Sequence, residues 1–204
     1  MMDHPHHPKH RFDSDKVESL LDPRRRLIDD PLEVVRRLGV RSGMRVVDLG
    51  CGAGFFTPAL LSAVGEGGWV AAVDVQEPVL AFFRRHVGEP PNLESVLADM
   101  SATGLPGGNW DAVFIAFTLH EVVVVEALKE IRRLLKPGGL LAVLDWGRRE
   151  PCPEREPGRR AGPPEDERLL VDALRRHLDA AGFTELACGE FLDGCQYWLQ
   201  ARKD

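Results

Sequence analysis

The sequence predicts an α/β fold: a doubly wound sheet of seven strands in the order 3-2-1-4-5-7-6, with strand seven antiparallel, plus an N-terminal helical cap. Strand-like and helix-like segments alternate from residue 46 to residue 146, the pattern of a mostly parallel sheet covered by helices. Two further strand-like segments end the chain and predict an antiparallel hairpin turned at Asp193-Gly194. A glycine-rich stretch after the first strand marks the sheet edge where ligands bind in such folds.

The first part of the chain is predicted to be a separate unit. Residues 1–15 are polar and rich in histidine, and we expect them to be mobile. Residues 15–27 and 31–38 are expected to form two short helices, the second beginning with proline, where a missing N–H is tolerated. We therefore expect a flexible His-rich tail and helical cap over residues 1–40, ahead of a cofactor-binding domain over residues 41–204.

Five strands are predicted in the middle of the chain. Each is a short run of β-branched and other apolar residues, and together they cover residues 46–49, 69–74, 96–100, 110–117 and 140–145. Helix-like segments separate these strands. The last of them, residues 128–135, is predicted to end where Lys136-Pro137-Gly138-Gly139 breaks the helical pattern.

The C-terminal part is predicted to contain a loop, a helix and the closing hairpin. Residues 147–164 are rich in proline, glycine, arginine and glutamate, which is typical of a loop, and they follow the carboxyl end of the fifth strand. Residues 165–181 place their leucines on one face of a predicted helix, which Gly182 stops. Residues 183–191 and 195–201 form the hairpin strands.

The most informative stretch is the loop Gly50-Cys51-Gly52-Ala53-Gly54. Alternating glycines let the backbone turn sharply and let a ligand approach closely, and the N–H groups of the following helix point back at this loop. The pattern therefore predicts a nucleotide-type cofactor site. Phe55 stands where the dinucleotide fingerprint G-x-G-x-x-G has its third glycine, which argues against NAD and FAD.

Two acids after the next strands fit such a cofactor. Asp74 ends the second strand, some twenty residues after the glycines, where a carboxylate can bind both ribose hydroxyls. The alternative for Asp74 is to cap the following helix. Asp99 follows the third strand, and its carboxylate can accept a hydrogen bond from an adenine amino group.

These motifs, taken in order, resemble those of a known family. VVDLGCGAG, the acid of VAAVD, LADM, WDAVFIAFTLHEV and the run through KPGG are similar to successive motifs of the class I S-adenosylmethionine-dependent methyltransferases, in the type 11 group that includes ubiquinone/menaquinone C-methyltransferases. A narrower resemblance to small prokaryotic methyltransferases rests on His10-Arg11-Phe12-Asp13, Asp74-Val75-Gln76, residues 116–121 and Asp145-Trp146. The resemblance implies a Rossmann-like fold, methyltransferase activity, and S-adenosylmethionine as the cofactor, with S-adenosyl-homocysteine as its product.

The cofactor contacts expected from these motifs are the glycine loop, the acids and the neighbours of those acids. They are Asp48, Gly50, Cys51, Gly52, Gly54, Asp74, Val75, Gln76, Asp99, Met100 and Ala116. We expect the Asp48 carboxylate to bind loop N–H groups or the methionine ammonium group, and Phe12 to cover the adenosyl site. No metal site is predicted, because the cluster of His4, His6, His7 and His10 is more typical of a solvated tail.

His120 is the predicted catalytic residue. It follows the fourth strand, at the edge that faces the sulfonium in this fold, and a neutral imidazole there can deprotonate an acceptor. The alternative is a histidine that caps the next helix or orients a loop. Glu121 either orients His120 or faces solvent, and Asp145 and Trp146 either line the acceptor site or serve as ordinary loop and packing residues.

The composition favours a cytoplasmic protein, the resemblance implies an enzyme with a small-molecule acceptor, and we expect a monomer or homodimer. The chain has 204 residues and a net charge of −6, which argues against nucleic acid as a general partner. No apolar run approaches the ~20 residues of a membrane helix, and the N-terminus lacks the pattern of a signal peptide. The four cysteines are scattered, so neither a zinc site nor a disulfide framework is indicated.

Two other functions stay open. An arsenite or metalloid methyltransferase would need thiolates, for which Cys152, Cys188 and Cys195 are present without the expected spacing. A sensor or scaffold would bind S-adenosylmethionine without transferring its methyl group. Methylation of nucleic-acid amino groups is disfavoured, because residues 116–119 do not match the Asn/Asp-Pro-Pro-Tyr/Phe motif, and the basic clusters at residues 24–26 and 148–160 are interleaved with acids.

Overall fold

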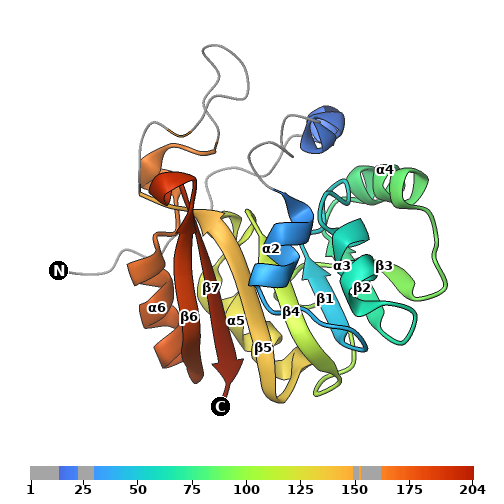
Figure 1. Cartoon of the computed structure of the whole chain (residues 1–204). Coiled ribbons are helices and arrows are strands. Elements are labelled where there is room, and N and C mark those ends of the chain that lie inside the picture. Colours follow the sequence, from blue (N-terminus) through green and yellow to red (C-terminus); the bar gives the residue numbers. More distant parts are fainter. Residues whose placement is uncertain (1–13, 23–29, 149–151, 153–161) are drawn as a thin grey trace.

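The computed structural model has a single seven-stranded sheet in the order β3-β2-β1-β4-β5-β7-β6 (Figure 1). The structure describes residues 14–22, 30–148, 152 and 162–204. Five neighbouring strands are parallel, and β7 runs antiparallel to β5 on one side and to β6 on the other. The predicted fold class, strand order and antiparallel seventh strand are confirmed.

Strands and helices alternate through the centre of the chain, except that no helix lies in the described residues between β3 and β4. The strands are β1 (Arg45–Leu49), β2 (Trp69–Asp74), β3 (Leu93–Leu97), β4 (Trp110–Ala116), β5 (Leu135–Trp146), β6 (Phe183–Phe191) and β7 (Gln196–Lys203). The α-helices are α2 (Pro31–Arg37), α3 (Thr57–Val64), α4 (Glu77–Val87), α5 (Val124–Leu134) and α6 (Val171–Ala180). Short 3-10 helices are η1 (Ser14–Leu21), η2 (Leu119–Glu121), η3 (Glu165–Glu167) and η4 (Leu192–Gly194).

Two helical layers enclose the sheet. The helices α2, α3 and α4 cover one face, and α5 and α6 cover the other (Figure 1). Successive residues of a strand point to opposite faces, so Val46 of β1 packs in the cluster of α2 and α3, whereas Val47 packs in the cluster of α5 and α6. Both faces are therefore buried, which explains why the central strands are almost wholly apolar.

The element boundaries differ from the predicted ones where polar residues enter an element. β3 spans Leu93–Leu97 instead of residues 96–100. Its polar side chains are accounted for by neighbours, since Glu94 accepts a hydrogen bond from the Trp69 indole and Ser95 accepts one from Arg84. An edge strand of this kind lacks the continuous apolar run of a central strand. For this reason the predicted start of β3, at residue 96, is three residues later than the observed start.

The last two central elements also begin earlier than predicted. α5 begins at Val124 instead of residue 128, and β5 begins at Leu135, before the predicted break at residues 136–139. The register between β4 and β5 shifts where this segment pairs, so the glycines form an irregular start of the strand.

The predicted helix over residues 165–181 is divided in two. η3 and α6 are separated by residues 168–170, and the first of these, Arg168, is buried and has an extended backbone. Its guanidinium donates hydrogen bonds to the carbonyl oxygens of Pro163 and Gly147, and these bonds fix the chain in a turn. At the other end of the chain, η1 occupies the first part of the predicted helix over residues 15–27.

Several predictions concern residues outside those that the structure describes. They are the His-rich tail, Phe12, the basic cluster at residues 24–26, the second half of the first predicted helix and most of the 147–164 loop. The proposed boundary at residue 40 stays a prediction. α2, which precedes it, packs against α3 in one apolar cluster with Val46 and Phe114.

The cysteines form a disulfide that the sequence analysis did not expect. Cys152 and Cys195 are bonded with an S–S distance of 2.04 Å, and both are buried. They are separated by 43 residues, so no local spacing marks the pair. The bond joins the segment after β5 to the start of β7 and packs against Trp146. Because disulfides are rare in cytosolic proteins, this pair gives no support to the cytoplasmic location, which stays a prediction.

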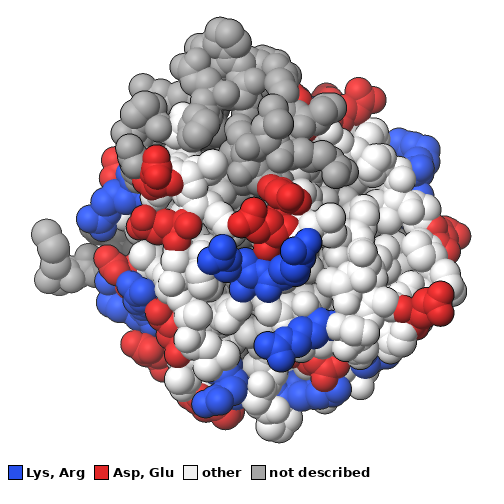
Figure 2. Space-filling model, in the orientation of Figure 1, with Lys and Arg blue, Asp and Glu red and all other residues white. Residues whose placement is uncertain are grey.

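The surface carries both signs of charge. Basic and acidic side chains alternate over the face displayed in Figure 2. Within the described part of the chain, no helix combines the length and the apolar character needed to cross a bilayer.

Replacing Cys152 by Ser should lower the free energy of unfolding by about 2–4 kcal/mol without reductant, because the unfolded chain loses a cross-link across a long loop. Urea unfolding followed by tryptophan fluorescence measures this change. Cys188→Ser is the matched control: it removes a half-buried free thiol on β6 and should change stability by less than about 0.5 kcal/mol. A Cys152→Ser protein as stable as this control would show that the bond does not stabilise the fold.

Candidate functional site

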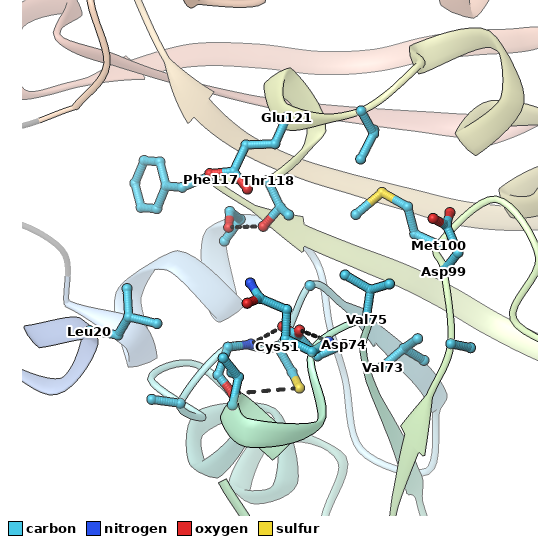
Figure 3. Close-up of a pocket in the computed structure, with 18 of the residues that line it drawn as sticks. Leu20, Cys51, Val73, Asp74, Val75, Asp99, Met100, Phe117, Thr118 and Glu121 are labelled. Atoms are coloured by element: carbon cyan, nitrogen blue, oxygen red, sulfur yellow. Dashed lines mark hydrogen bonds between the residues drawn. The ribbon is translucent and has the colours of Figure 1, made fainter. Parts of the chain in front are cut away.

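A cavity of about 560 Å³ opens at the carboxyl edge of the sheet (Figure 3). This volume lies within the range of small-molecule and cofactor sites. The glycine loop and the end of β2 form one wall, the segment after β4 forms the opposite wall, and Leu20 of η1 lies at one side. The described wall residues include three aromatic rings and four carboxylates but no cationic side chain.

Nine of the eleven predicted cofactor residues line this cavity. They are Gly50, Cys51, Gly52, Asp74, Val75, Gln76, Asp99, Met100 and Ala116. Asp48 and Gly54 are not among the wall residues, and neither is His120. The structure thus brings together four separate segments, each at the end of one of the strands β1, β2, β3 and β4, as the parallel sheet requires.

The glycine loop is shaped by contacts that leave no room for side chains. Gly50 has a φ of 72°, and a Cβ there would lie 2.6 Å from the Thr118 side chain on the opposite wall. Gly54 has a φ of 88°, and a Cβ there would lie 2.4 Å from Val87. Gly54 therefore supports the cavity from behind, because it lets the loop pack closely against α4.

Asp74 connects the glycine loop to the start of α4. Its Oδ2 accepts a hydrogen bond of 3.1 Å from the Gly52 N–H, and its Oδ1 accepts one of 2.9 Å from the Gln76 N–H. Burial raises the pKa of Asp74, while the N–H groups of Gln76, Gly52 and Val75 act to lower it. A carboxylate oxygen has more than one acceptor site, so both the predicted ribose contact and the capping role are compatible with this geometry.

Asp48 lies behind the loop in the buried part of β1. Its Oδ2 accepts a hydrogen bond of 2.7 Å from the Thr57 hydroxyl, at the start of α3. The pKa of Asp48 is raised to about 7. Burial is the largest cause, the hydrogen bond from Thr57 acts to lower the pKa, and the Asp74 carboxylate acts to raise it. This hydrogen bond is to a side chain of α3, whereas the prediction named loop N–H groups or a ligand ammonium group.

The third segment contains Asp99 and Met100, which follow β3. The Asp99 Oδ1 accepts hydrogen bonds from the backbone N–H and the hydroxyl of Ser101, at 2.9 and 2.7 Å. Figure 3 shows Asp99 and Met100 together at one end of the cavity, away from Leu20. This position is the one predicted for an adenine contact, and Asp99 itself is exposed there.

The wall after β4 contains residues that the sequence analysis did not assign to the site. Phe117 lies in the left-handed region, with a φ of 57°, and its ring packs 4.7 Å from the ring of Trp146. Thr118 donates a hydrogen bond from its hydroxyl to the Ala116 carbonyl oxygen. Glu121 lies in η2, and its side chain projects toward Phe117 and Thr118 (Figure 3). No sequence pattern distinguishes which residue of this segment faces the cavity.

His120 is buried behind this wall and contacts two carboxylates. Its Nδ1 lies 2.7 Å from Asp145 Oδ1, and its Nε2 lies 4.0 Å from Glu121 Oε1. Burial acts to lower the pKa of His120, but the charge and hydrogen bond of Asp145, together with the charges of Glu121 and Glu167, raise it above its ordinary value. The imidazole therefore retains its proton more strongly than a free histidine, which disfavours the neutral base that was predicted.

A family model described as a methyltransferase domain matches residues 47–143 of the chain. The chain is also similar to curated proteins. It is 36% identical over 113 residues to a demethylmenaquinone methyltransferase of Staphylococcus aureus (strain MRSA252), covering 55% of this chain and 47% of that protein. It is 39% identical over 114 residues to a ubiquinone/menaquinone biosynthesis C-methyltransferase of Escherichia fergusonii, covering 54% and 45%. The chain spans about half the length of the curated relatives it matches.

The similarity extends over nearly the whole chain in one solved structure. A SAM-dependent methyltransferase from Aquifex aeolicus superposes with a TM-score of 0.84 and 32% sequence identity. The alignment covers 95% of this chain and 100% of that protein. Elements outside the central matched region, including the closing hairpin, are therefore shared with a methyltransferase of similar size.

Gly50→Ala should weaken S-adenosylmethionine binding at least tenfold, because the added methyl group meets Thr118 across the cavity. Gly43→Ala is the matched control: Gly43 also has a positive φ, 81°, but a Cβ there has no neighbour within 4 Å. Both variants carry the backbone strain of about 1–2 kcal/mol. Only the first should lose affinity in titration calorimetry, and equal losses would assign the effect to strain alone.

Asp74→Ala should weaken S-adenosylmethionine binding by about 1–3 kcal/mol, through lost hydrogen bonds to a charged group. The substitution also frees the N–H groups of Gly52 and Gln76. Calorimetry with the cofactor and with NAD measures the effect. Unchanged cofactor affinity in a folded Asp74→Ala protein would contradict the ribose assignment.

Proposed function

The chain belongs to the S-adenosylmethionine-dependent methyltransferases, and from this membership we propose that it methylates a small molecule with an apolar body that is neutral or cationic. The observation that carries the proposal is the shape of the cavity. Predicted cofactor residues from β1, β2 and β3 form one wall, while Phe117, Thr118 and Glu121 form the other. The second wall is available for an acceptor.

The residues present fit the cofactor. S-adenosylmethionine, when bound, supplies a methyl group that is already activated on a positively charged sulfur. Gly50 and Gly52 have no Cβ, so a ligand can approach the loop backbone closely. A side chain at either position would meet Thr118 or Leu20. Asp74 is oriented by backbone N–H groups at the end of β2, and Asp99 stands beside Met100 at the far end of the cavity. Four carboxylates in the described walls favour a cationic ligand.

The residues of the cavity walls also indicate the charge and the apolar character of the acceptor. The described walls carry no cationic side chain that would bind a carboxylate or phosphate group, and they contain the rings of Phe55, Phe56 and Phe117. An acceptor with an aromatic or other apolar body would pack against these rings. Phenols and hydroquinones have this chemistry, and the two curated relatives carry demethylmenaquinone and ubiquinone/menaquinone in their names.

For the chain as a whole we propose that residues 1–40 contribute a cap and residues 41–204 the cofactor domain. Leu20 lines the cavity next to Gly52, which supports a covering role for η1. The acceptor would enter between this cap, the segment around Glu121 and the chain that follows β5. We expect the protein to work as a monomer or homodimer.

The two alternatives are distinguished by specific features. A metalloid methyltransferase would need free thiolates, but Cys152 and Cys195 are bonded to each other. No group of three potential metal ligands occurs within the described residues. A sensor would bind the cofactor in a site closed to an acceptor, whereas this cavity extends from Asp74 to Glu121 and Phe117.

A methyl-transfer screen should reveal activity on phenols or hydroquinones, with S-adenosyl-homocysteine release as the measurement. Thiols, amines and arsenite belong in the same screen, with and without dithiothreitol, and benzoates test the expected exclusion of anions. Activity on anionic acceptors alone would overturn the acceptor class. Arsenite methylation only after reduction would support the metalloid alternative, and cofactor binding without any methyl transfer would support the sensor.

A further inference from the structure

Glu121 occupies a position in the cavity that the other wall carboxylates do not. Its side chain is 31% exposed and projects toward Phe117 and Thr118 (Figure 3). Asp74 is bound to the N–H groups of Gly52 and Gln76, and Asp99 is bound to Ser101. The fourth wall carboxylate, Glu126, is paired with Lys129. The Glu121 carboxylate makes no hydrogen bond to a described residue. It is therefore available to a ligand on the wall opposite the predicted cofactor residues.

Behind Glu121 lies a buried pair of a histidine and a carboxylate, neither of which is among the described wall residues. His120 is 8% exposed and Asp145 is fully buried. Asp145 Oδ1 accepts hydrogen bonds from His120 Nδ1 at 2.7 Å and from the Trp146 N–H at 2.8 Å. These two bonds fix the imidazole so that its other nitrogen, Nε2, is directed to the Glu121 side, 4.0 Å from Oε1.

We propose that Glu121 accepts the proton of the methyl acceptor and that the His120–Asp145 pair positions and tunes it. This inference rests on the proposed methyl transfer, and it replaces His120 as the expected base. His120 and Asp145 act through Glu121 and are positioning residues, because neither lies in the cavity wall. Burying a bare carboxylate such as Asp145 is costly unless it is paired, so the imidazolium form of His120 is the stable partner.

The charges around Glu121 come from several elements. His120 precedes it in η2, Asp145 lies at the end of β5, Asp74 lies at the end of β2, and Glu167 of η3 acts on His120. The pKa of Glu121 is raised to about 7: burial is the largest cause, the imidazole of His120 acts to lower it, and the Asp145 and Asp74 carboxylates add to the increase. A group with this pKa is effective as a general base near neutral pH.

The proposed step balances for an acceptor that carries a hydroxyl proton. The acceptor oxygen forms a bond to the methyl carbon, the bond between that carbon and sulfur breaks, and its electron pair stays on sulfur. The hydroxyl proton passes to a Glu121 carboxylate oxygen. The products are the methylated acceptor, S-adenosyl-homocysteine and a protonated Glu121, which returns its proton to water when the products leave.

Glu121→Gln should lower turnover of a phenol or hydroquinone by about 10²–10⁴-fold. Its affinity for S-adenosylmethionine in calorimetry should stay within about threefold of wild type. Turnover of a tertiary amine or thioether, which carries no proton to lose, should fall far less. Glu77→Gln is the control: it changes an exposed carboxylate of α4 that pairs with Arg84 on the surface, and turnover should be unaffected. Full activity of a folded Glu121→Gln protein on the phenol would overturn the proposal.

The pH dependence separates a tuned base from a structural residue. As pH rises through about 7, Glu121 loses its proton and becomes able to accept one, so kcat/KM should rise through the same range. His120→Gln removes a cation that lowers the pKa of Glu121, and the rise should therefore move to higher pH. A His120→Gln protein that binds cofactor and melts normally, yet shows an unmoved rise, would remove the positioning role.

The pKa of Glu121 can be measured without an acceptor, and such a measurement does not depend on the proposed activity. Carbon-13 NMR of labelled glutamate carboxyls, with Glu121→Gln to assign the signal, should show Glu121 titrating near pH 7, and higher in His120→Gln. Titration of Glu121 near its ordinary pKa of about 4.3 would overturn the inference whatever the screen finds. If Glu121 titrates near 7 but no acceptor is methylated, the proposed function fails instead.

Discussion

The carboxylate of Asp74 holds two parts of the cavity in a fixed relation. One oxygen binds the Gly52 N–H in the loop after β1, and the other binds the Gln76 N–H at the start of α4. The start of the same loop is held by backbone bonds from the Gly50 and Cys51 N–H groups to the Val73 carbonyl oxygen, and Asp74 adds a bond at Gly52. The loop position then determines how closely Gly50 approaches Thr118 across the cavity. A single side chain at a strand end thus organises both walls.

The charge of the site depends on which carboxylates are stabilised by hydrogen-bond donors or by a neighbouring histidine. Asp74 and Asp99 are stabilised by hydrogen-bond donors of the loops, while Asp145 is stabilised by His120. Among the described residues, the nearest cationic partner of Glu121 is the more distant imidazole, and burial raises the pKa of Glu121 to about 7. The same surplus of negative charge that suits a sulfonium ligand therefore leaves one carboxylate poised to hold or release a proton.

The sheet and the clustering of nine predicted residues in the walls of one cavity could be predicted because they depend on local patterns. Apolar runs mark the buried strands, and the parallel topology then brings the strand ends to one edge. β3 was misplaced because an edge strand tolerates residues such as Glu94, and the Cys152–Cys195 bond was missed because 43 residues separate its ends. His120 and Glu121 are neighbours in one 3-10 turn, and only the turn geometry decides which of them faces the cavity.

At position 117, the backbone conformation favours glycine, whereas the packing of the side chain favours phenylalanine. The positive φ of Phe117 costs about 1–2 kcal/mol for a residue with a side chain, and glycine would adopt the same backbone freely. Its ring, however, packs on Trp146 and faces the cavity, so a stability-guided consensus or ancestral redesign that introduced glycine there would remove part of the cavity wall. In engineering terms, position 117 is one to exclude from thermostabilising libraries and to include in libraries that select for new acceptors.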